Sequence, residues 1–164
     1  MTSNTLNSEK SAAVQPKTTR DNLRLISLIL AVIGIGVSGY LAYTKISGAE
    51  IACIEGVTNC EVVNNSIYAF IGGIYVGYIG LAGYLAILLA LLLEDRISLL
   101  RQWGRLALAG MTFFGFLFSG YLTSIEAFVL REWCQWCVIS AIVMTALFAL
   151  SLARLWRADS TDEA

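Results

Sequence analysis

Four cysteines are the residues of this chain best suited to chemistry, because the 164-residue sequence contains no histidine. Cys134 and Cys137 form a CxxC motif at the start of an apolar run, and Cys53 and Cys60 lie in a polar segment with six residues between them. The lack of histidine excludes imidazole-based acid–base catalysis and histidine ligation of zinc or haem. The cysteine pairs are therefore the candidate reactive groups, and their natural reaction is dithiol–disulfide exchange.

The CxxC pair is predicted to open a helix. Residues three apart share a helix face, so the two sulfurs are close enough for a disulfide. The partial positive charge and free N–H groups of a helix N-terminus stabilise a thiolate, so we expect the pKa of Cys134 to be lowered. Trp133 and Trp136 flank the motif as interfacial aromatic residues do, which places Cys137 one turn deeper, toward hydrocarbon.

The composition predicts which elements position these cysteines. Hydrophobic residues make up 57% of the chain, charged residues 14%, and the mean hydropathy is +0.71. Four apolar runs, at residues 23–43, 70–93, 106–130 and 138–156, each have a length that suits one membrane crossing. We therefore expect an all-α membrane protein, a four-transmembrane-helix bundle. Gly73 and Gly77 in the second run, and Gly34 in the first, predict close helix packing. No basic patch dominates, so nothing indicates nucleic-acid binding.

The distribution of lysine and arginine predicts the orientation. With both termini in the cytoplasm, nine of these residues lie inside and only two, Lys45 and Arg131, lie outside. Residues 1–20 are then a disordered cytoplasmic tail, residues 21–157 the four-helix domain, and residues 158–164 a short cytoplasmic tail. All four cysteines face the periplasm or an equivalent extracytoplasmic side, which permits disulfides.

The first pair is predicted to form a second disulfide in a mobile loop, which reaches a soluble protein outside and swings back to the CxxC. Two alternatives remain: two structural disulfides that pin the loops, and a zinc site with four thiolates. Because the chain has no visible flavin, haem or nucleotide motif, exchange needs a diffusible acceptor. A lipid-soluble quinone takes two electrons, as one dithiol supplies, and lies where Cys137 points.

The pattern resembles the vitamin K epoxide reductase family, particularly its bacterial members, over about residues 23–156. The motifs that carry the resemblance are the outer cysteine pair, "CEVVNNS" (60–66), "IGGIYVGYIGLAGY" (71–84), "SGYLTSIEAFVL" (119–130) and "WCQWC" (133–137). The resemblance implies a four-helix bundle around a quinone, with a short outer-face helix after the first loop. This sequence departs from the family at Tyr75, where bacterial relatives often have proline. The departure puts the bend of the second helix in question.

The resemblance also implies roles for individual residues. Cys134 and Cys137 are the active-site pair, and Cys137 reduces the quinone. Cys53 and Cys60 carry electrons from a partner's thiols. Ser66 donates a hydrogen bond to a quinone carbonyl, whereas from the residues alone it equally suits the N-cap of a helix over "IYAFIGG". Glu126 is not part of what the resemblance implies: from its position near the outer end of the third span, it is either an interfacial residue or a proton acceptor for the reduced quinone.

We therefore expect a thiol–disulfide oxidoreductase that uses ubiquinone or menaquinone and reoxidises an exported thioredoxin-fold, DsbA-like partner for disulfide bond formation. Because the sequence continues only to "RADSTDEA" after Trp156, the partner is expected to be a separate protein. Two alternatives stay open: a vitamin K quinone or epoxide reductase, and a non-catalytic membrane scaffold with structural disulfides.

Overall fold

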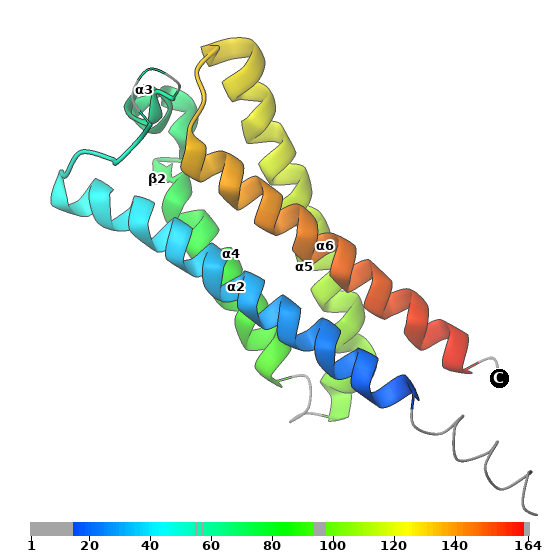
Figure 1. Ribbon diagram of the computed structural model, residues 1–164. Coiled ribbons are helices and arrows are strands. Elements are labelled where there is room, and N and C mark those ends of the chain that lie inside the picture. The colour runs from blue at the N-terminus through cyan, green and yellow to red at the C-terminus, as the bar shows by residue number, and fades with distance from the viewer. Residues whose placement is uncertain (1–14, 55, 57, 94–97, 163–164) are drawn as a thin grey trace, which may run out of the picture.

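A computed structural model of the chain describes residues 15–54, 56, 58–93 and 98–162. Within these ranges four long helices run along one another (Figure 1): α2 (Gln15–Ser47), α4 (Val76–Leu93), α5 (Ser98–Ile125) and α6 (Gln135–Asp162). Each contains a segment long and apolar enough to cross a membrane, and the last turn of the third segment belongs to the π-helical turn η2 (Glu126–Leu130). The protein is thus an integral membrane protein with four spans, as predicted.

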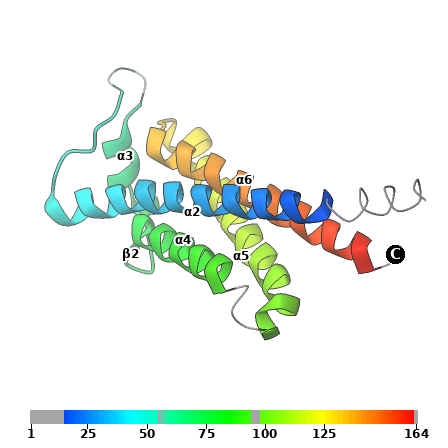
Figure 2. The ribbon, with the colours of Figure 1, turned by 60° about the horizontal axis from the view of Figure 1, so that its bottom comes forward.

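The order of the helices brings the four cysteines to one end of the bundle. Helix α2 packs against α4 and α6, and α5 packs against α6. The start of α2 and the end of α6 lie at one end, while the loop after α2, the short helix α3 (Cys60–Asn65) and the turn before α6 lie at the other (Figures 1 and 2). The predicted short helix after the first loop is therefore confirmed, and all four cysteines meet at its end of the bundle.

The helices extend beyond the predicted apolar runs at both termini. Helix α2 begins at Gln15, so residues 15–20 are helical and not the disordered tail that was predicted. Residues 1–14 of that tail lie outside the described residues. Helix α6 continues through Asp162, six residues beyond the predicted end of the fourth run. Polar residues can continue a helix past the hydrocarbon because every backbone bond of a helix is satisfied within the segment.

The second span begins later than predicted, at Val76 instead of residue 70. A 3₁₀ turn, η1 (Ile67–Ala69), leads into a two-residue hairpin of β1 (Phe70–Ile71) and β2 (Ile74–Tyr75). Gly72 and Gly73 form the turn with φ of 58° and 83°, a left-handed conformation that glycine adopts without a steric penalty. The prediction that Gly73 packs helices together is therefore wrong, and the hairpin, not a bent helix, changes the direction of the chain before Tyr75.

The core of the bundle draws on all four long helices. Its buried residues are Ala31, Tyr84, Ile87, Leu91, Leu108, Val143, Met144 and Leu147. Tyr84 lies so close to α2 that a Cβ on Gly34 would overlap its ring, which confirms the close approach predicted at Gly34. The Tyr84 hydroxyl donates to the carbonyl oxygen of Ser140 at 2.8 Å, so this buried phenol is paired.

Candidate active site

Helix α6 begins directly after Cys134, whose sulfur acts as a cap. The backbone N–H of Cys137 donates to Cys134 Sγ at 3.4 Å, and the N–H of Val138 donates to the Cys134 carbonyl at 3.0 Å. The first bond satisfies one of the N–H groups that a helix leaves free at its N-terminus, and the second is the first regular bond of the helix. Cys134 is fully buried, whereas Cys137 is partly buried, and both are free thiols.

The surroundings of Cys134 favour its thiolate. A hydrogen bond from the Cys137 thiol is the main reason that the pKa of Cys134 lies below the usual range of a thiol, and the Cys137 N–H and the Asn64 side chain act in the same direction. Burial and the nearby Glu126 carboxylate oppose this shift without reversing it. The predicted direction is therefore confirmed. The largest cause is the neighbouring thiol, and the free N–H of the helix N-terminus adds to it.

Two residues to which the sequence analysis assigned no role at the site support the Cys134 sulfur. Asn64 contacts the sulfur directly, and Tyr75 contacts Asn64. Asn64 Nδ2 donates to the carbonyl of Cys60 at 2.8 Å and to Cys134 Sγ at 3.4 Å. The Tyr75 hydroxyl donates to Asn64 Oδ1. Burial, followed by the charges of Cys137 and Cys134, raises the pKa of Tyr75, so its hydroxyl remains a donor. The available signal was the position of Asn64, one helical turn after Cys60.

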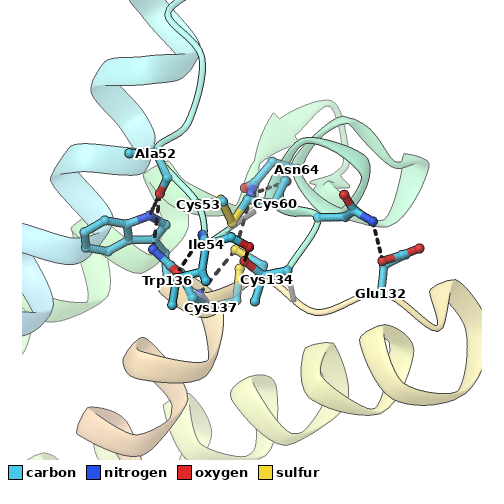
Figure 3. The surroundings of a disulfide bond; sticks show 12 residues. Ala52, Cys53, Ile54, Cys60, Asn64, Glu132, Cys134, Trp136 and Cys137 are labelled. Carbon is cyan, nitrogen blue, oxygen red and sulfur yellow. Dashed lines mark hydrogen bonds between the residues drawn. A yellow bond between two sulfur atoms is a disulfide. The ribbon is translucent and has the colours of Figure 1, made fainter. Parts of the chain in front are cut away.

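The loop pair is oxidised and lies against the CxxC. Cys53 and Cys60 form a disulfide with their Cα atoms 6.3 Å apart. Cys60 is 1% exposed and shares a buried cluster with Cys134, while Cys53 at the edge of this cluster is half-buried. Figure 3 shows the four cysteines gathered at one place, with Asn64 beside them. The structure thus brings together all four predicted cysteines.

The first loop is docked on α6. The sequence analysis had instead predicted a mobile loop. The carbonyl of Ala52 accepts hydrogen bonds from Gln135 Nε2 at 3.2 Å and from Trp136 Nε1 at 2.8 Å, and the N–H of Ile54 donates to Gln135 Oε1 at 3.3 Å (Figure 3). The Tyr40 ring packs against Trp136 with centroids 4.7 Å apart. Gln135 and Trp136, the two middle residues of the CxxC, therefore hold the loop disulfide in place.

The other side of the loop is held by a second set of bonds. The N–H of Asn59 donates to the carbonyl of Trp133 at 3.1 Å, and Asn59 Nδ2 donates to Glu132 Oε2 at 2.7 Å (Figure 3). The sequence analysis assigned no role to these polar residues. Their bonds join segments more than 70 residues apart in the chain, so they tie the two cysteine pairs into one unit.

A largely apolar cavity of about 480 Å³ opens beside the CxxC. Its wall is formed mainly by α4, α5 and α6. The polar or reactive residues that line it include Cys137, Ser66, Glu126, Asn64 and Tyr68. Cys134 does not line it. Cys137 is therefore the cysteine of the pair whose surroundings include the cavity, whereas Cys134 faces the loop disulfide.

Ser66, to which the family resemblance assigned a quinone contact, lies on the cavity wall. Its hydroxyl donates to the carbonyl of Val63 at 2.8 Å. Ser66 is the N-cap residue of η1 by position, as the alternative interpretation expected, but its side chain makes no capping hydrogen bond there. The hydroxyl has one proton, so it must break its hydrogen bond to the Val63 carbonyl before it can donate to a ligand in the cavity.

The fold and site define a class: a four-helix membrane protein in which two cysteine pairs meet beside an apolar cavity. The model of the vitamin K epoxide reductase family matches residues 25–152, and the chain belongs to this family. The thiol-disulfide oxidoreductase LTO1 of Arabidopsis thaliana is 32% identical over 120 residues, which cover 70% of this chain and 32% of that protein. The chain therefore spans about a third of the length of this curated relative. Both findings support a redox function that uses disulfides.

Proposed function

We propose that the protein is a quinone-dependent thiol oxidase. It takes electrons from an exported thioredoxin-fold, DsbA-like partner through Cys53 and Cys60, passes them to Cys134 and Cys137, and delivers them to ubiquinone or menaquinone. The observation that carries the proposal is the continuous arrangement of the two cysteine pairs and the cavity. The loop disulfide lies against Cys134, and Cys137 lines an apolar chamber.

The burial of the loop cysteines supports an order of transfer. Cys53 is the half-buried member of its disulfide, and Cys60 is buried beside Cys134. A partner thiolate that attacks Cys53 forms a mixed disulfide and releases Cys60 as a thiolate. Cys60 then attacks an oxidised CxxC at Cys134, and Cys137 leaves with the electron pair and takes up a proton released by the partner's dithiol. The partner's second thiol resolves its mixed disulfide, and Cys53 then closes again with Cys60, so that the CxxC is left as a dithiol.

The cavity fits a quinone ring in size and character. Ligand pockets usually measure about 300–1,000 Å³ and are mostly apolar with a few polar groups, and this cavity of about 480 Å³ agrees with both features. When bound, a quinone supplies an acceptor for two electrons and two protons. Cys137 would face it, and Ser66 would bind a carbonyl oxygen after exchanging its bond to Val63.

The oxidase reaction is tested with purified protein in detergent, a reduced DsbA-like partner and the short-chain ubiquinone-1. We expect the quinone absorbance to fall as the partner becomes oxidised, and we expect Cys137→Ala to abolish this reaction because the last carrier is missing. Wild-type protein that oxidises no thiol at the expense of quinone would refute the proposal. A parallel assay with vitamin K epoxide shows which acceptor is preferred, and a preference for the epoxide would favour the reductase alternative.

The position of the quinone is tested by filling the cavity. Gly83 lines the cavity, and a Cβ built there meets no atom within 4 Å, so Gly83→Leu projects into open space. We expect it to raise the KM for ubiquinone-1 by about tenfold or more, since its side chain occupies the binding volume. Gly36→Leu is the matched control, because Gly36 is exposed on α2 with equal room for a Cβ. Equal effects of both changes would place the quinone elsewhere.

A further inference from the structure

Glu126 is a carboxylic acid in an unusual place. It is the first residue of the π-helical turn η2 that follows α5, and only 4% of its surface is exposed. A buried carboxylate is costly unless hydrogen bonds or nearby charges compensate, so its partners indicate its role. π-Helical turns of this kind are frequent at functional sites.

The partners of Glu126 are the two cysteines of the CxxC. Glu126 Oε2 accepts a hydrogen bond from the backbone N–H of Cys134 at 3.2 Å. The Cys137 thiol lies near the same carboxylate, and both groups line the cavity. One acidic group therefore binds the backbone that positions the Cys134 thiolate and lies beside the thiol that lines the cavity.

Glu126 is also the one carboxyl group among the described residues that line the cavity. The chain has no histidine, and the hydroxyl of the buried cavity residue Tyr84 is engaged with Ser140. Among these groups, Glu126 is the base that lies beside both cysteines of the CxxC and also reaches the cavity.

The stoichiometry of the proposed function, on which this inference rests, requires a proton carrier at this point. When a dithiol reduces a quinone, one S–S bond forms, and two electrons and two protons convert the quinone to a hydroquinone. The Cys134 sulfur accepts hydrogen bonds from the Cys137 N–H and from Asn64, which favour its thiolate, so in this scheme Cys134 gives its proton to the medium. Cys137 still holds its proton in an apolar chamber, and this proton must leave as the disulfide forms.

We propose that Glu126 is the catalytic proton carrier of this site, taking the proton of the Cys137 thiol and delivering it to an oxygen of the quinone. The carboxylate is regenerated in each cycle, so it is neither oxidised nor reduced. The second proton of the hydroquinone comes from water and balances the one that Cys134 released. The bond from the Cys134 N–H orients the carboxylate toward the thiol throughout.

The decisive variant is Glu126→Gln. Its amide oxygen still accepts from the Cys134 N–H, but it cannot carry a proton. We expect the single-turnover reduction of ubiquinone-1 by the dithiol form to slow about 100-fold or more, the usual range for loss of a general acid–base. The opposite half-reaction, reduction of the oxidised protein by dithiothreitol, should change by less than about threefold, since it passes through sulfur exchange alone.

Two further variants control the result. Glu61→Gln makes the same change of charge on an exposed residue of α3 and should leave both half-reactions unaltered. Glu126→Asp keeps an acid and should restore a substantial part of the quinone step. The inference is overturned if Glu126→Gln reduces quinone at the wild-type rate, or if both half-reactions slow together, which would indicate a purely structural role. Wild-type protein that reduces no quinone would instead refute the proposed function itself.

Discussion

At the scale of single residues, the site distinguishes two chemically identical cysteines by their surroundings. The Cys134 sulfur accepts hydrogen bonds from the Cys137 N–H and from Asn64, and each of these stabilises negative charge on the sulfur. Cys137 receives no such set and lines the cavity. The two sulfurs are therefore suited to different steps of electron transfer, because Cys134 lies toward the loop disulfide and Cys137 toward the proposed acceptor.

Asn64→Leu tests this assignment because it removes a donor to the Cys134 sulfur while keeping the side-chain size. Loss of a hydrogen bond to the charged form raises the pKa of Cys134, so thiolate absorbance at 240 nm should emerge at higher pH than in wild type. The change also leaves the buried Tyr75 hydroxyl without its acceptor, with an expected loss of about 1–3 kcal/mol in stability.

Asn65→Leu provides the matched control for that change. Asn65 is the next residue of α3, is exposed, and accepts a hydrogen bond from Lys45 Nζ at 2.8 Å. Its replacement should leave the absorbance titration unchanged. An unaltered titration in Asn64→Leu as well would show that its bond to the sulfur contributes nothing to the thiolate.

At the scale of elements, the turn between η2 and α6 sets the position of the CxxC. Arg131 ends the π-helical turn with φ of 55° and is the single non-glycine residue with positive φ in the described part of the chain. A side chain in this left-handed conformation costs roughly 1–2 kcal/mol, which glycine avoids. The sequence therefore tolerates local strain directly before its reactive motif.

Arg131→Gly should raise the thermal stability of the protein, by about 1 kcal/mol after the greater freedom of glycine in the unfolded chain is included. The measurement is the midpoint of thermal unfolding in detergent. Arg131→Ala separates the backbone from the side chain, because alanine keeps the unfavourable conformation and should bring no gain. Equal stabilisation by alanine would show that removal of the charge, and not relief of the backbone, is responsible.

At the scale of the whole molecule, most basic residues lie at one end of the bundle and the cysteines lie at the other. Among the described residues, Lys45 and Arg131 are the two basic residues at the cysteine end, and the seven other lysines and arginines fall in the helical segments that lead to the opposite end. This asymmetry favours an arrangement in which the cysteine end faces the extracytoplasmic side. Such an arrangement places the loop disulfide where an exported thioredoxin-fold partner can reach it.

Labelling of single cysteines in intact cells checks this orientation. In a chain whose four native cysteines are serine, Ala49→Cys lies in the exposed loop at the cysteine end, and Leu93→Cys lies exposed at the end of α4. A membrane-impermeant maleimide should label the first variant in intact cells and the second only after lysis. The reverse pattern would invert the topology and separate the loop from any exported partner.

The sequence by itself determined the number of spans and the candidate cysteines, and its resemblance to a known family implied the short helix after the first loop. Hydropathy and residue spacing are local properties, and a membrane fixes the length and internal hydrogen bonding of each crossing. Only the tertiary structure decided that the loop is docked, that α4 begins after a glycine turn, and that Asn64, Tyr75 and Glu126 surround the CxxC. The bond from Asn64 to Cys134 joins residues 70 apart in the chain. Such contacts depend on how the helices and their end segments pack, and no local pattern of residues encodes that packing.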